Sequence, residues 1–342
     1  MPHNAQAHTT TNPFTATVLR WYAQYGRELP WRGTHDPYAI WLSEVILQQT
    51  RIQQGRDYWL RFMQRFPTVQ ALADATEDEV LRLWQGLGYY SRARNLHFAA
   101  RQIVDMGAFP QTLEGIRSLK GVGDYTAAAI ASMAFGLPAA AVDGNVFRVL
   151  SRYFGIDTPI NTTEGKKTFT ALAQQLLPQQ EPAAFNQALM DFGAMQCTPQ
   201  NPRCDTCPLQ EACGARRTGR TELLPVKLKT LKVKTRHLIY IYIRCDGHIA
   251  VRRRPAGDIW QGLWEPLLVE DAPLPAFDEQ PVLLARRVKH VLTHRVLTAD
   301  FYLLQAAARP SLPDGYVWIR EEEFDDYAKP RLVERLADLL PE

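Results

Sequence analysis

The stretch SLKGVGDYTAAAIASMAF, residues 118–135, predicts two helices joined by a glycine turn. Gly121 and Gly123 let the backbone of the turn approach a ligand closely, and the helix that opens near Asp124 or Tyr125 aims its unpaired amides and positive dipole end outward. Such a turn suits an anion. No strand precedes it and it holds only two glycines, so a nucleotide-binding Rossmann loop fits poorly. Taken alone, the stretch also fits a plain glycine cap between two helices.

The chain around this stretch divides into two halves with different periodicity. From residue 14 to about residue 213, apolar residues recur at the three- and four-residue spacing of helices. After residue 236 the period changes to two, as in HLIYIYIR, and a helix is expected over PRLVERLADLL. The expected fold is therefore multidomain, with an all-helical domain over 14–215 and an α+β domain over 237–342.

Residues 216–236 are expected to link the two domains. They hold eight Lys or Arg against one Glu, which fits a solvated tether as well as a strap that follows DNA phosphates. In the whole chain 39 Lys and Arg oppose 36 Asp and Glu. With a formal net charge of only +3, a polyanion would have to meet a local basic patch.

Residues 1–13 are polar and lack the apolar segment of a secretory signal, so we expect a flexible tail and a cytoplasmic, nucleoid-associated protein. No apolar run reaches the roughly 20 residues that a bilayer crossing requires, so no membrane partner is expected. Nothing in the sequence indicates an obligate dimer, and we expect a monomer.

Four of the five cysteines lie within CTPQNPRCDTCPLQEAC, residues 197–213, and predict a metal site. Disulfides are disfavoured in a reducing compartment, so four thiolate ligands are the leading interpretation. One close pair with two outlying cysteines suits a cubane iron–sulfur cluster, and zinc is the alternative. The expected ligands are Cys197, Cys204, Cys207 and Cys213, whereas Cys245 is expected to be a small buried hydrophobe.

Two carboxylates stand alone in long uncharged stretches. Asp143, in PAAAVDGNVFRVL (138–150), precedes an apolar helix that it can cap. Glu44 is the only charged residue of YAIWLSEVILQQT (38–50); if it is buried, desolvation raises its pKa and lets it donate a proton near neutrality. The alternatives are a simple cap for Asp143 and a solvent-facing position for Glu44.

Together, the helix–glycine hairpin–helix, the Asp about twenty residues further on and the four-cysteine loop resemble the helix-hairpin-helix DNA glycosylases of the endonuclease III superfamily. Within it, six runs in order resemble the adenine DNA glycosylases of the MutY type across nearly the whole helical half: LPWR, WLSEVILQQT, GLGYYSRARNL, LKGVGDYTAAAI, VDGNVFRVLSR and FNQALMDFGAMQCTPQNPRC.

This resemblance implies a role for four residues of the catalytic site. Glu44 falls on the general acid and Asp143 on the carboxylate that stabilises the sugar cation. Tyr125 stands where the lyase relatives carry the Schiff-base lysine, which implies a monofunctional glycosylase with Tyr125 and Asn145 orienting the carboxylates. The cofactor it implies is a [4Fe-4S] cluster.

The implied partner is double-stranded DNA with adenine opposite 8-oxoguanine or guanine. Tyr89 would be the stacking wedge, although an ordinary packing role also fits it. The other residues implied to bind substrate or DNA are Arg32 and Gln187 at the adenine pocket, Gln49, Thr50, Leu87 and Gly88 in the duplex, and the turn Gly121, Val122 and Gly123.

The second half resembles a Nudix-type domain in HIAVRRRPAGDIWQGLWEPLL, residues 248–268. The glutamate-rich metal-binding box of catalytic Nudix enzymes is missing, and REEEFDD (320–326) fits an acidic surface. In the resembled family this domain senses 8-oxoguanine through a Phe-Ser-His loop, which corresponds here to Leu292, Thr293 and His294. Thr293 and His294 keep polar groups for that contact, whereas the Phe is replaced.

The expected function is hydrolysis of the N-glycosidic bond of mispaired adenine, by base flipping and general-acid catalysis. Three alternatives remain open at the level of sequence: a bifunctional glycosylase/lyase for oxidised pyrimidines, a non-catalytic iron–sulfur DNA-binding module, and a nucleotide-pyrophosphate hydrolase.

Overall fold

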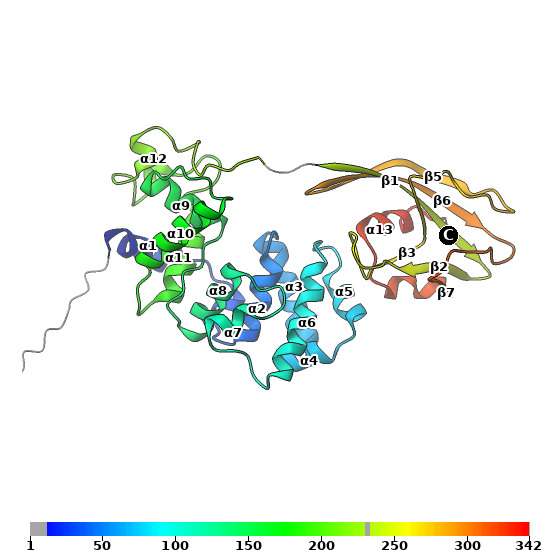
Figure 1. The fold of residues 1–342 in the computed structure, drawn as a ribbon, viewed down its shortest axis with the longest axis horizontal. Coiled ribbons are helices and arrows are strands. Elements are labelled where there is room, and N and C mark those ends of the chain that lie inside the picture. Colours follow the sequence, from blue (N-terminus) through cyan, green and yellow to red (C-terminus); the bar gives the residue numbers. More distant parts are fainter. Residues whose placement is uncertain (1–11, 230–232, 342) are drawn as a thin grey trace, which may run out of the picture. The chain divides into compact units, whose positions relative to one another are not determined.

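The computed structural model describes residues 12–229 and 233–341, which form two compact units (Figure 1). One unit comprises the described residues up to Met63 together with Ala99–Lys229, and the other comprises Gln64–Phe98 together with the described residues after Lys229. The expected tail falls mainly on residues 1–11, outside the described residues, and residue 12 already caps the first helix. The expected linker includes the end of one short helix and the start of the first strand.

Residues 13–217 are helical, as their apolar spacing predicted, and they belong to the first unit except for residues 64–98, which belong to the second. The boundaries between the units fall inside α3 and α6. The helices are α1 (Pro13–Tyr25), α2 (Pro37–Leu47), α3 (Ile52–Arg65), α4 (Val69–Asp74), α5 (Glu77–Trp84), α6 (Ser91–Asp105), α7 (Leu113–Arg117), α8 (Asp124–Phe135), α9 (Gly144–Phe154), α10 (Thr163–Leu176), α11 (Pro182–Met195) and α12 (Gly214–Arg217), with single 3-10 turns η1 (Pro30–Arg32) and η2 (Cys204–Thr206).

Two helices that are apolar on all sides form the centre of this unit. Every residue of 38–46 in α2 and of 126–133 in α8 is buried, and the two helices pack on each other. Helix α11 packs on both α8 and α9. A helix that is apolar on all sides is stable only when other elements bury it. A polar side chain on α2 or α8 therefore needs a hydrogen-bond partner or a place on a cavity.

The helix–glycine hairpin–helix lies where the sequence predicted it. Helix α7 packs on α8, and Gly121 between them adopts a φ of +79°, in the left-handed region that favours glycine. Helix α8 begins at Asp124 with Gly123 as its N-cap, and no side chain caps it. The first backbone amides of α8 therefore point outward and donate no hydrogen bond to a capping side chain.

The C-terminal half folds into one mixed seven-stranded sheet, ordered β3-β2-β1-β6-β5, with β4 added to β1 and β7 added to β2. Strands β1 and β6 are parallel, and the other pairs are antiparallel. The strands are β1 (Lys234–Cys245), β2 (His248–Arg253), β3 (Trp264–Glu265), β4 (Leu267–Glu270), β5 (Val282–Leu292), β6 (Arg295–Gln305) and β7 (Tyr316–Arg320), followed by η3 (Glu321–Asp326) and α13 (Arg331–Ala337).

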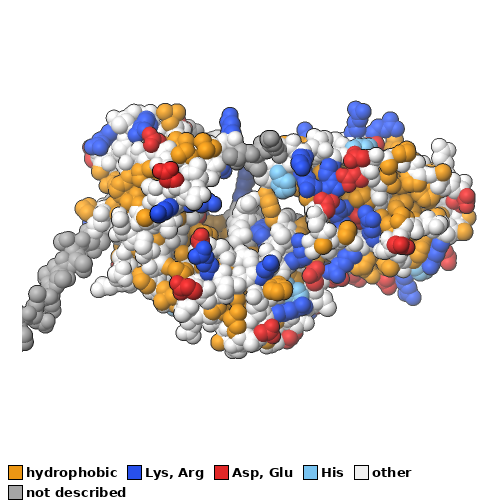
Figure 2. All heavy atoms as spheres, in the orientation of Figure 1, with side chains coloured by type: hydrophobic (Ala, Val, Ile, Leu, Met, Phe, Trp, Pro, Cys, Tyr) orange, Lys and Arg blue, Asp and Glu red, His pale blue; other side chains and the backbone are white. Residues whose placement is uncertain are grey.

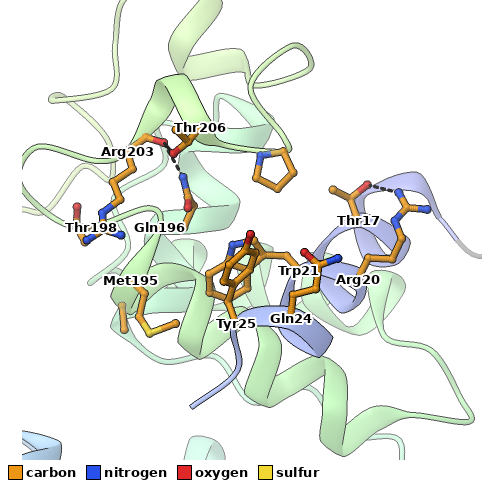
Figure 3. Close-up of a pocket in the computed structure, with 12 residues that line it drawn as sticks. Thr17, Arg20, Trp21, Gln24, Tyr25, Met195, Gln196, Thr198, Arg203 and Thr206 are labelled. Atoms are coloured by element: carbon orange, nitrogen blue, oxygen red, sulfur yellow. Dashed lines mark hydrogen bonds between the residues drawn. The ribbon is translucent and has the colours of Figure 1, made fainter.

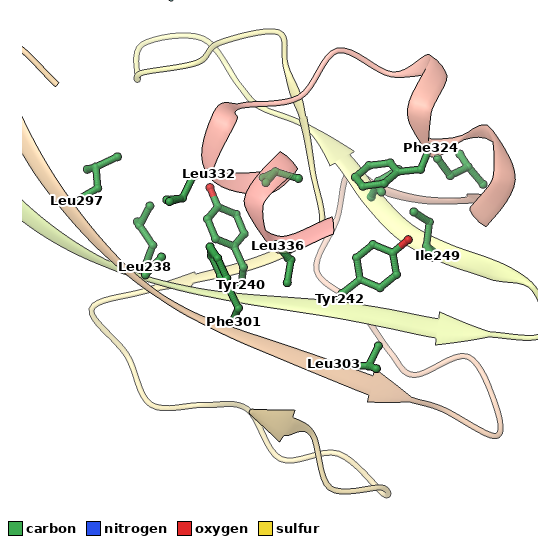
Figure 4. Close-up of a cluster of buried hydrophobic side chains, with 14 residues drawn as sticks. Leu238, Tyr240, Tyr242, Ile249, Leu297, Phe301, Leu303, Phe324, Leu332 and Leu336 are labelled. Atoms are coloured by element: carbon green, nitrogen blue, oxygen red, sulfur yellow. The ribbon is translucent and has the colours of Figure 1, made fainter. Parts of the chain in front are cut away.

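Strand β1 is central, and alternate residues pack on opposite faces of the sheet. Leu238, Tyr240 and Tyr242 join a cluster with β6 and with Leu332 and Leu336 of α13, which covers that face (Figure 4). Residues 239, 241 and 243, all Ile, join a second cluster on the other face. Cys245 is buried, as expected of a small hydrophobe.

Charged side chains of both signs are interspersed on the face drawn in Figure 2, in agreement with the near-balanced composition. Among the described residues, no helix combines the length and apolar character needed to cross a bilayer.

Candidate active site

A cavity of about 340 Å³ in the first unit brings the two lone carboxylates together. Its walls come from η1, the C-terminal end of α2, and the N-terminal ends of α8 and α9, with α11 behind them. The predicted site residues that line it are Arg32, Glu44, Gln49, Thr50, Tyr125, Asp143, Asn145 and Gln187.

Glu44 is buried, with 7% of its surface exposed, which excludes the solvent-facing alternative. Tyr125 Oη donates a hydrogen bond of 2.8 Å to Glu44 Oε2. Burial raises the pKa of Glu44 to about 7; the hydrogen bond from Tyr125 opposes this rise, and the nearby charge of Asp143 adds to it. Glu44 is therefore a carboxyl group that can release or hold a proton near neutral pH.

Asp143 is the N-cap of α9, and its Oδ1 accepts the amide of Val146 at 2.8 Å. Its other oxygen accepts Asn145 Nδ2 at 2.7 Å. Burial raises the pKa of Asp143 above its usual value, and the hydrogen bonds from Val146 and Asn145 limit that rise. Both the predicted cap and a position on the cavity are observed, so the same carboxylate can serve as cap and as cavity group.

The sequence did not predict Asp191, which is fully buried behind the cavity. Its carboxylate accepts Arg32 Nη1 at 2.7 Å and Nη2 at 2.8 Å, and also the backbone amide of Arg27 at 2.9 Å. Burial alone would raise the pKa of Asp191, but the bonds from Arg32 and Arg27 outweigh it and lower the pKa. Asp191 is the only charged residue in FNQALMDFGAM. A lone charge in an apolar helix is the same signal that singled out Glu44, so the sequence could have indicated Asp191 as well.

Gly193 of α11 is a second residue that the sequence did not single out. A Cβ atom on Gly193 would lie 2.6 Å from Asn145 Cβ, so only glycine allows α9 to approach α11 this closely. Arg148 spans the same contact, with Nη2 donating to Asn145 Oδ1 at 2.8 Å and to the Gly193 carbonyl at 2.7 Å. An isolated glycine within a helical pattern was the available signal.

A larger cavity of about 840 Å³ lies elsewhere in this unit (Figure 3). Arg20 and Trp21 of α1 lie on one side of it and Gln196 and Arg203 on the other. No Asp or Glu of the described residues lines it, so it offers no carboxyl group for acid–base chemistry. The smaller cavity is therefore the candidate active site.

The second unit holds the other predicted recognition residues. Leu87 is buried, while Gly88 and the 41% exposed Tyr89 have left-handed φ values of +71° and +46°. Thr293 and His294 are exposed and form the two-residue turn between β5 and β6. Tyr89 Oη and Thr293 Oγ1 are in hydrogen-bond contact.

The four clustered cysteines line one small cavity, together with Arg152 and Arg216. Within the described ranges, no three His, Cys, Asp or Glu side chains converge closely enough to hold a single metal ion. A cubane cluster suits a wider spacing, because its four ligands bind separate corners. Burial raises the pKa of Cys207 to about 11, so this thiol ionises near neutrality only beside a cation. Four thiols around one cavity are a donor set that fits the four corners of a cubane iron–sulfur cluster.

Comparisons with known proteins agree with the fold. Residues 42–178 match the HhH-GPD superfamily of base excision DNA repair proteins, residues 197–213 the iron–sulfur binding domain of endonuclease III, and residues 239–339 the Nudix domain. The predicted fold class and the iron–sulfur cofactor are therefore confirmed.

Among curated proteins, an adenine DNA glycosylase of Buchnera aphidicola is 36% identical over 75% of this chain and 73% of its own length. The human adenine DNA glycosylase is 45% identical over 62% of this chain, which corresponds to 41% of the human protein. The chain thus spans well under half of that relative. Among solved structures, a thermostable thymine-DNA glycosylase is 32% identical, with a TM-score of 0.56 over 60% of this chain and 95% of its own.

Proposed function

This chain belongs to the adenine DNA glycosylase family, and we propose that it removes adenine mispaired with 8-oxoguanine or guanine from duplex DNA. The observation that carries the proposal is the cavity shared by Glu44 and Asp143. Cleavage of the N-glycosidic bond requires protonation of a poor leaving group and stabilisation of a cationic sugar, and two carboxylates in different environments can divide these tasks.

Glu44 is the proposed general acid that protonates the adenine ring at N7. With a pKa of about 7, a large fraction of Glu44 carries its proton at neutral pH and can still release it. Tyr125 Oη, which donates to Glu44 Oε2, leaves Oε1 as the oxygen on which the transferable proton is carried. Tyr125 is thus a positioning residue for the acid.

Asp143 is the proposed stabiliser of positive charge at the sugar C1′. Its two hydrogen bonds hold the carboxylate in place before the substrate arrives, so the site spends little free energy on reorganisation as the sugar cation forms. Water then attacks the sugar to complete the hydrolysis.

The base must leave the helical stack to enter such a cavity, which costs a few kcal/mol and costs least at a mismatch. Arg32 and Gln187 are proposed to border the adenine. Gln187 accepts the hydroxyl of Tyr22 at 2.7 Å and Arg32 is paired with Asp191, so both side chains are held in place. Gln49, Thr50, Leu87, Gly88 and Tyr89 are proposed to fill the duplex, with Gly121, Val122 and Gly123 at a phosphate.

The proposed reaction stops at base removal. In the part of the chain that the structure describes, no lysine lines the cavity, and the hydroxyl of Tyr125 donates to Glu44. Schiff-base formation needs a neutral amine at the sugar, which this wall does not supply. This composition favours a monofunctional glycosylase over a glycosylase/lyase.

Cys197, Cys204, Cys207 and Cys213 would hold the [4Fe-4S] cluster, which when bound crosslinks its loop through four iron–thiolate bonds. Arg152 Nη1 donates to Cys197 Sγ at 3.4 Å, and this guanidinium also donates to the carbonyls of Thr198 and Pro199. Arg152 thereby ties α9 to the loop.

Thr293 and His294 of the Nudix-type domain are proposed to contact 8-oxoguanine opposite the adenine. Both are exposed at a hairpin tip, where a hydroxyl and a ring nitrogen can reach a base edge. Every residue of the proposal lies in one chain, so we propose that a monomer acts on the DNA.

The test is incubation with duplexes that hold adenine opposite 8-oxoguanine, adenine opposite guanine, thymine opposite guanine, or oxidised thymine, followed by alkali. We expect strand breaks only after alkali and only at the adenine. Asp143→Asn keeps a cap acceptor but removes the charge, and should lower the rate at least about 10²–10³-fold.

Three other outcomes would redirect the assignment. Breaks without alkali at the oxidised pyrimidine would identify a glycosylase/lyase. Excision of thymine instead of adenine would identify a thymine-DNA glycosylase, the activity in the name of the similar solved structure. Bound but intact duplexes would identify a non-catalytic DNA-binding module.

A further inference from the structure

Strand β5 forms one edge of the sheet, and β6 is its single partner among the described strands (Figure 1). Its register shifts between Ala285 and Val288, where two residues of β5 oppose one residue of β6. The two residues are Arg286 and Arg287, and the opposing one is Asp300. This bulge turns two consecutive arginines out of the regular alternation of the strand.

A hydrogen bond from the backbone of Arg287 to Asp300 stabilises the bulge, although the backbone conformation of Arg287 is unfavourable. Arg287 has a φ of +52°, a region that a residue with a Cβ adopts only at a cost on the order of 1 kcal/mol. Its amide donates to Asp300 Oδ1 at 2.6 Å, while Asp300 Oδ2 lies 3.3 Å from His237 Nε2. Asp300 therefore binds the backbone of the bulge and leaves the Arg287 guanidinium unneutralised.

Most arginines of the sheet domain outside β5 pair with a carboxylate, although Arg309 and Arg335 form no ion pair with the described residues. Arg286, Arg287 and Lys289 are exposed, and over the described residues none of the three forms an ion pair. In contrast, each of the following arginines pairs with a carboxylate: Arg236, Arg244, Arg252, Arg253, Arg254, Arg295, Arg320 and Arg331.

We propose that Arg286, Arg287 and Lys289 form a contact surface for the phosphate backbone of duplex DNA, here called the β5 bulge patch. Clustered cations without carboxylate partners are free to displace the counterions of a polyanion, whereas paired arginines would first have to break their ion pairs. Arg335 adds to the same charge, because its Nη1 donates to the Lys289 carbonyl at 3.1 Å. The inference rests on the proposed function in taking DNA as the ligand.

The patch is placed to act together with the turn at Thr293 and His294. Thr293, in the turn that follows β5, is four positions after Lys289, a distance of about 13 Å in an extended strand. This corresponds to about four base-pair steps of duplex DNA. When the turn contacts one base, the patch reaches the backbone that flanks it and sets the register of the sheet domain on the DNA.

The experiment measures the salt dependence of DNA binding by the full chain. The variant Arg286→Ala/Arg287→Gly/Lys289→Ala removes the three charges, with glycine at the left-handed position so that the bulge persists. The control is Arg320→Ala, an exposed arginine already paired with Glu322. The probe is a duplex with a non-hydrolysable 2′-fluoro adenosine opposite 8-oxoguanine, titrated between about 50 and 200 mM salt.

We expect the slope of log affinity against log salt to decrease by about 3 in the triple variant, close to one for each lost phosphate contact, and to stay unchanged in the control. An unchanged slope would overturn the proposal, provided that the triple variant has the circular dichroism spectrum of the wild type. The β5 bulge patch would then be better suited to an acidic protein partner. Adenine excision by the wild type is measured in parallel. If it is absent while the slope still decreases, the proposed function fails and the patch stands.

Discussion

Glu44 and Asp143 share one cavity, but their oxygens have different partners. Asp143 accepts two nitrogen donors, which stabilise its anion, whereas Glu44 accepts one hydroxyl in a buried position. Burial raises the pKa of both groups, to about 7 for Glu44, and the hydrogen bonds from Val146 and Asn145 oppose the rise at Asp143. This difference supports the proposed roles of Glu44 as the acid and Asp143 as the charge stabiliser.

The pH dependence of excision should report the protonation of Glu44. The acid must carry its proton, so the single-turnover rate constant should fall about tenfold per pH unit above about pH 7. Glu44→Gln should lower the rate at pH 7 by about 10²–10⁴-fold and abolish this alkaline limb. A variant with the wild-type pH profile would show that another group donates the proton.

Glu44 should also make folding stability depend on pH. Its pKa in the folded state, about 7, lies above its usual value of 4.5, so the folded state favours the protonated form. The stabilisation is complete below about pH 4.5 and is lost as the pH rises through about 7, by an amount on the order of 3 kcal/mol. The free energy of unfolding of Glu44→Gln and of the wild type is measured with denaturant at acid and at alkaline pH. Relative to the wild type, the variant should be more stable at alkaline pH than at acid pH. Parallel pH curves would contradict the burial of this carboxyl.

At the scale of elements, the contact between α9 and α11 positions Asp143 and Asn145 in the site. Asp143 and Asn145 stand at the start of α9, and Gly193 lets α11 lie directly against them. Because the added Cβ would meet backbone-proximal atoms of Asn145, this helix cannot relieve the clash by rotating a flexible side chain.

Gly193→Ala should therefore displace Asn145 and reduce both stability and activity. Overpacking of this kind costs about 1–3 kcal/mol, and the excision rate should fall with the loss of the Asn145–Asp143 hydrogen bond. The control is Gly33→Ala, whose added Cβ meets nothing within 4 Å. Thermal unfolding and single-turnover excision measure the two effects, and a stable, fully active Gly193→Ala would contradict the close contact.

The cysteine loop should depend on iron. The purified protein is expected to be brown and to contain about four irons and four sulfides per chain. Cys204→Ser should lower the iron content and weaken protection of residues 197–213 against proteolysis, because the loop loses one of its crosslinks. A colourless wild-type protein with stoichiometric zinc would refute the cluster.

At the scale of the whole molecule, the two units divide the proposed work. The first unit holds the carboxylates and the cysteines, and the second holds Tyr89, Thr293 and His294. The proposed chemistry on adenine and the proposed reading of the opposite base should therefore be separable by mutation.

Thr293→Ala/His294→Ala should reduce the preference for 8-oxoguanine over guanine opposite adenine. Each lost hydrogen bond is worth about 0.5–1.5 kcal/mol, so the ratio of the two kcat/KM values should fall by about 2–10-fold per contact. Arg320→Ala should leave the ratio unchanged. A double variant with an undiminished ratio would place the recognition of 8-oxoguanine elsewhere.

The sequence alone determined much of this protein. It predicted the helical and sheet halves, the hairpin at Gly121, the capping role of Asp143 and an iron–sulfur segment at residues 197–213, because periodicity, capping and close cysteine spacing are local properties. It also singled out Glu44, because a lone charge on an apolar helix has to be paired or enclosed.

Only the tertiary structure decided what those residues face. Residues 44, 125 and 143 lie far apart in sequence, and their meeting in one cavity depends on how α2, α8 and α9 pack. The pairing of Arg32 with Asp191, the approach at Gly193 and the bulge at Arg287 likewise depend on the partner element. Burial and charge pairing arise from contacts between distant segments, and these interactions set the pKa of Glu44.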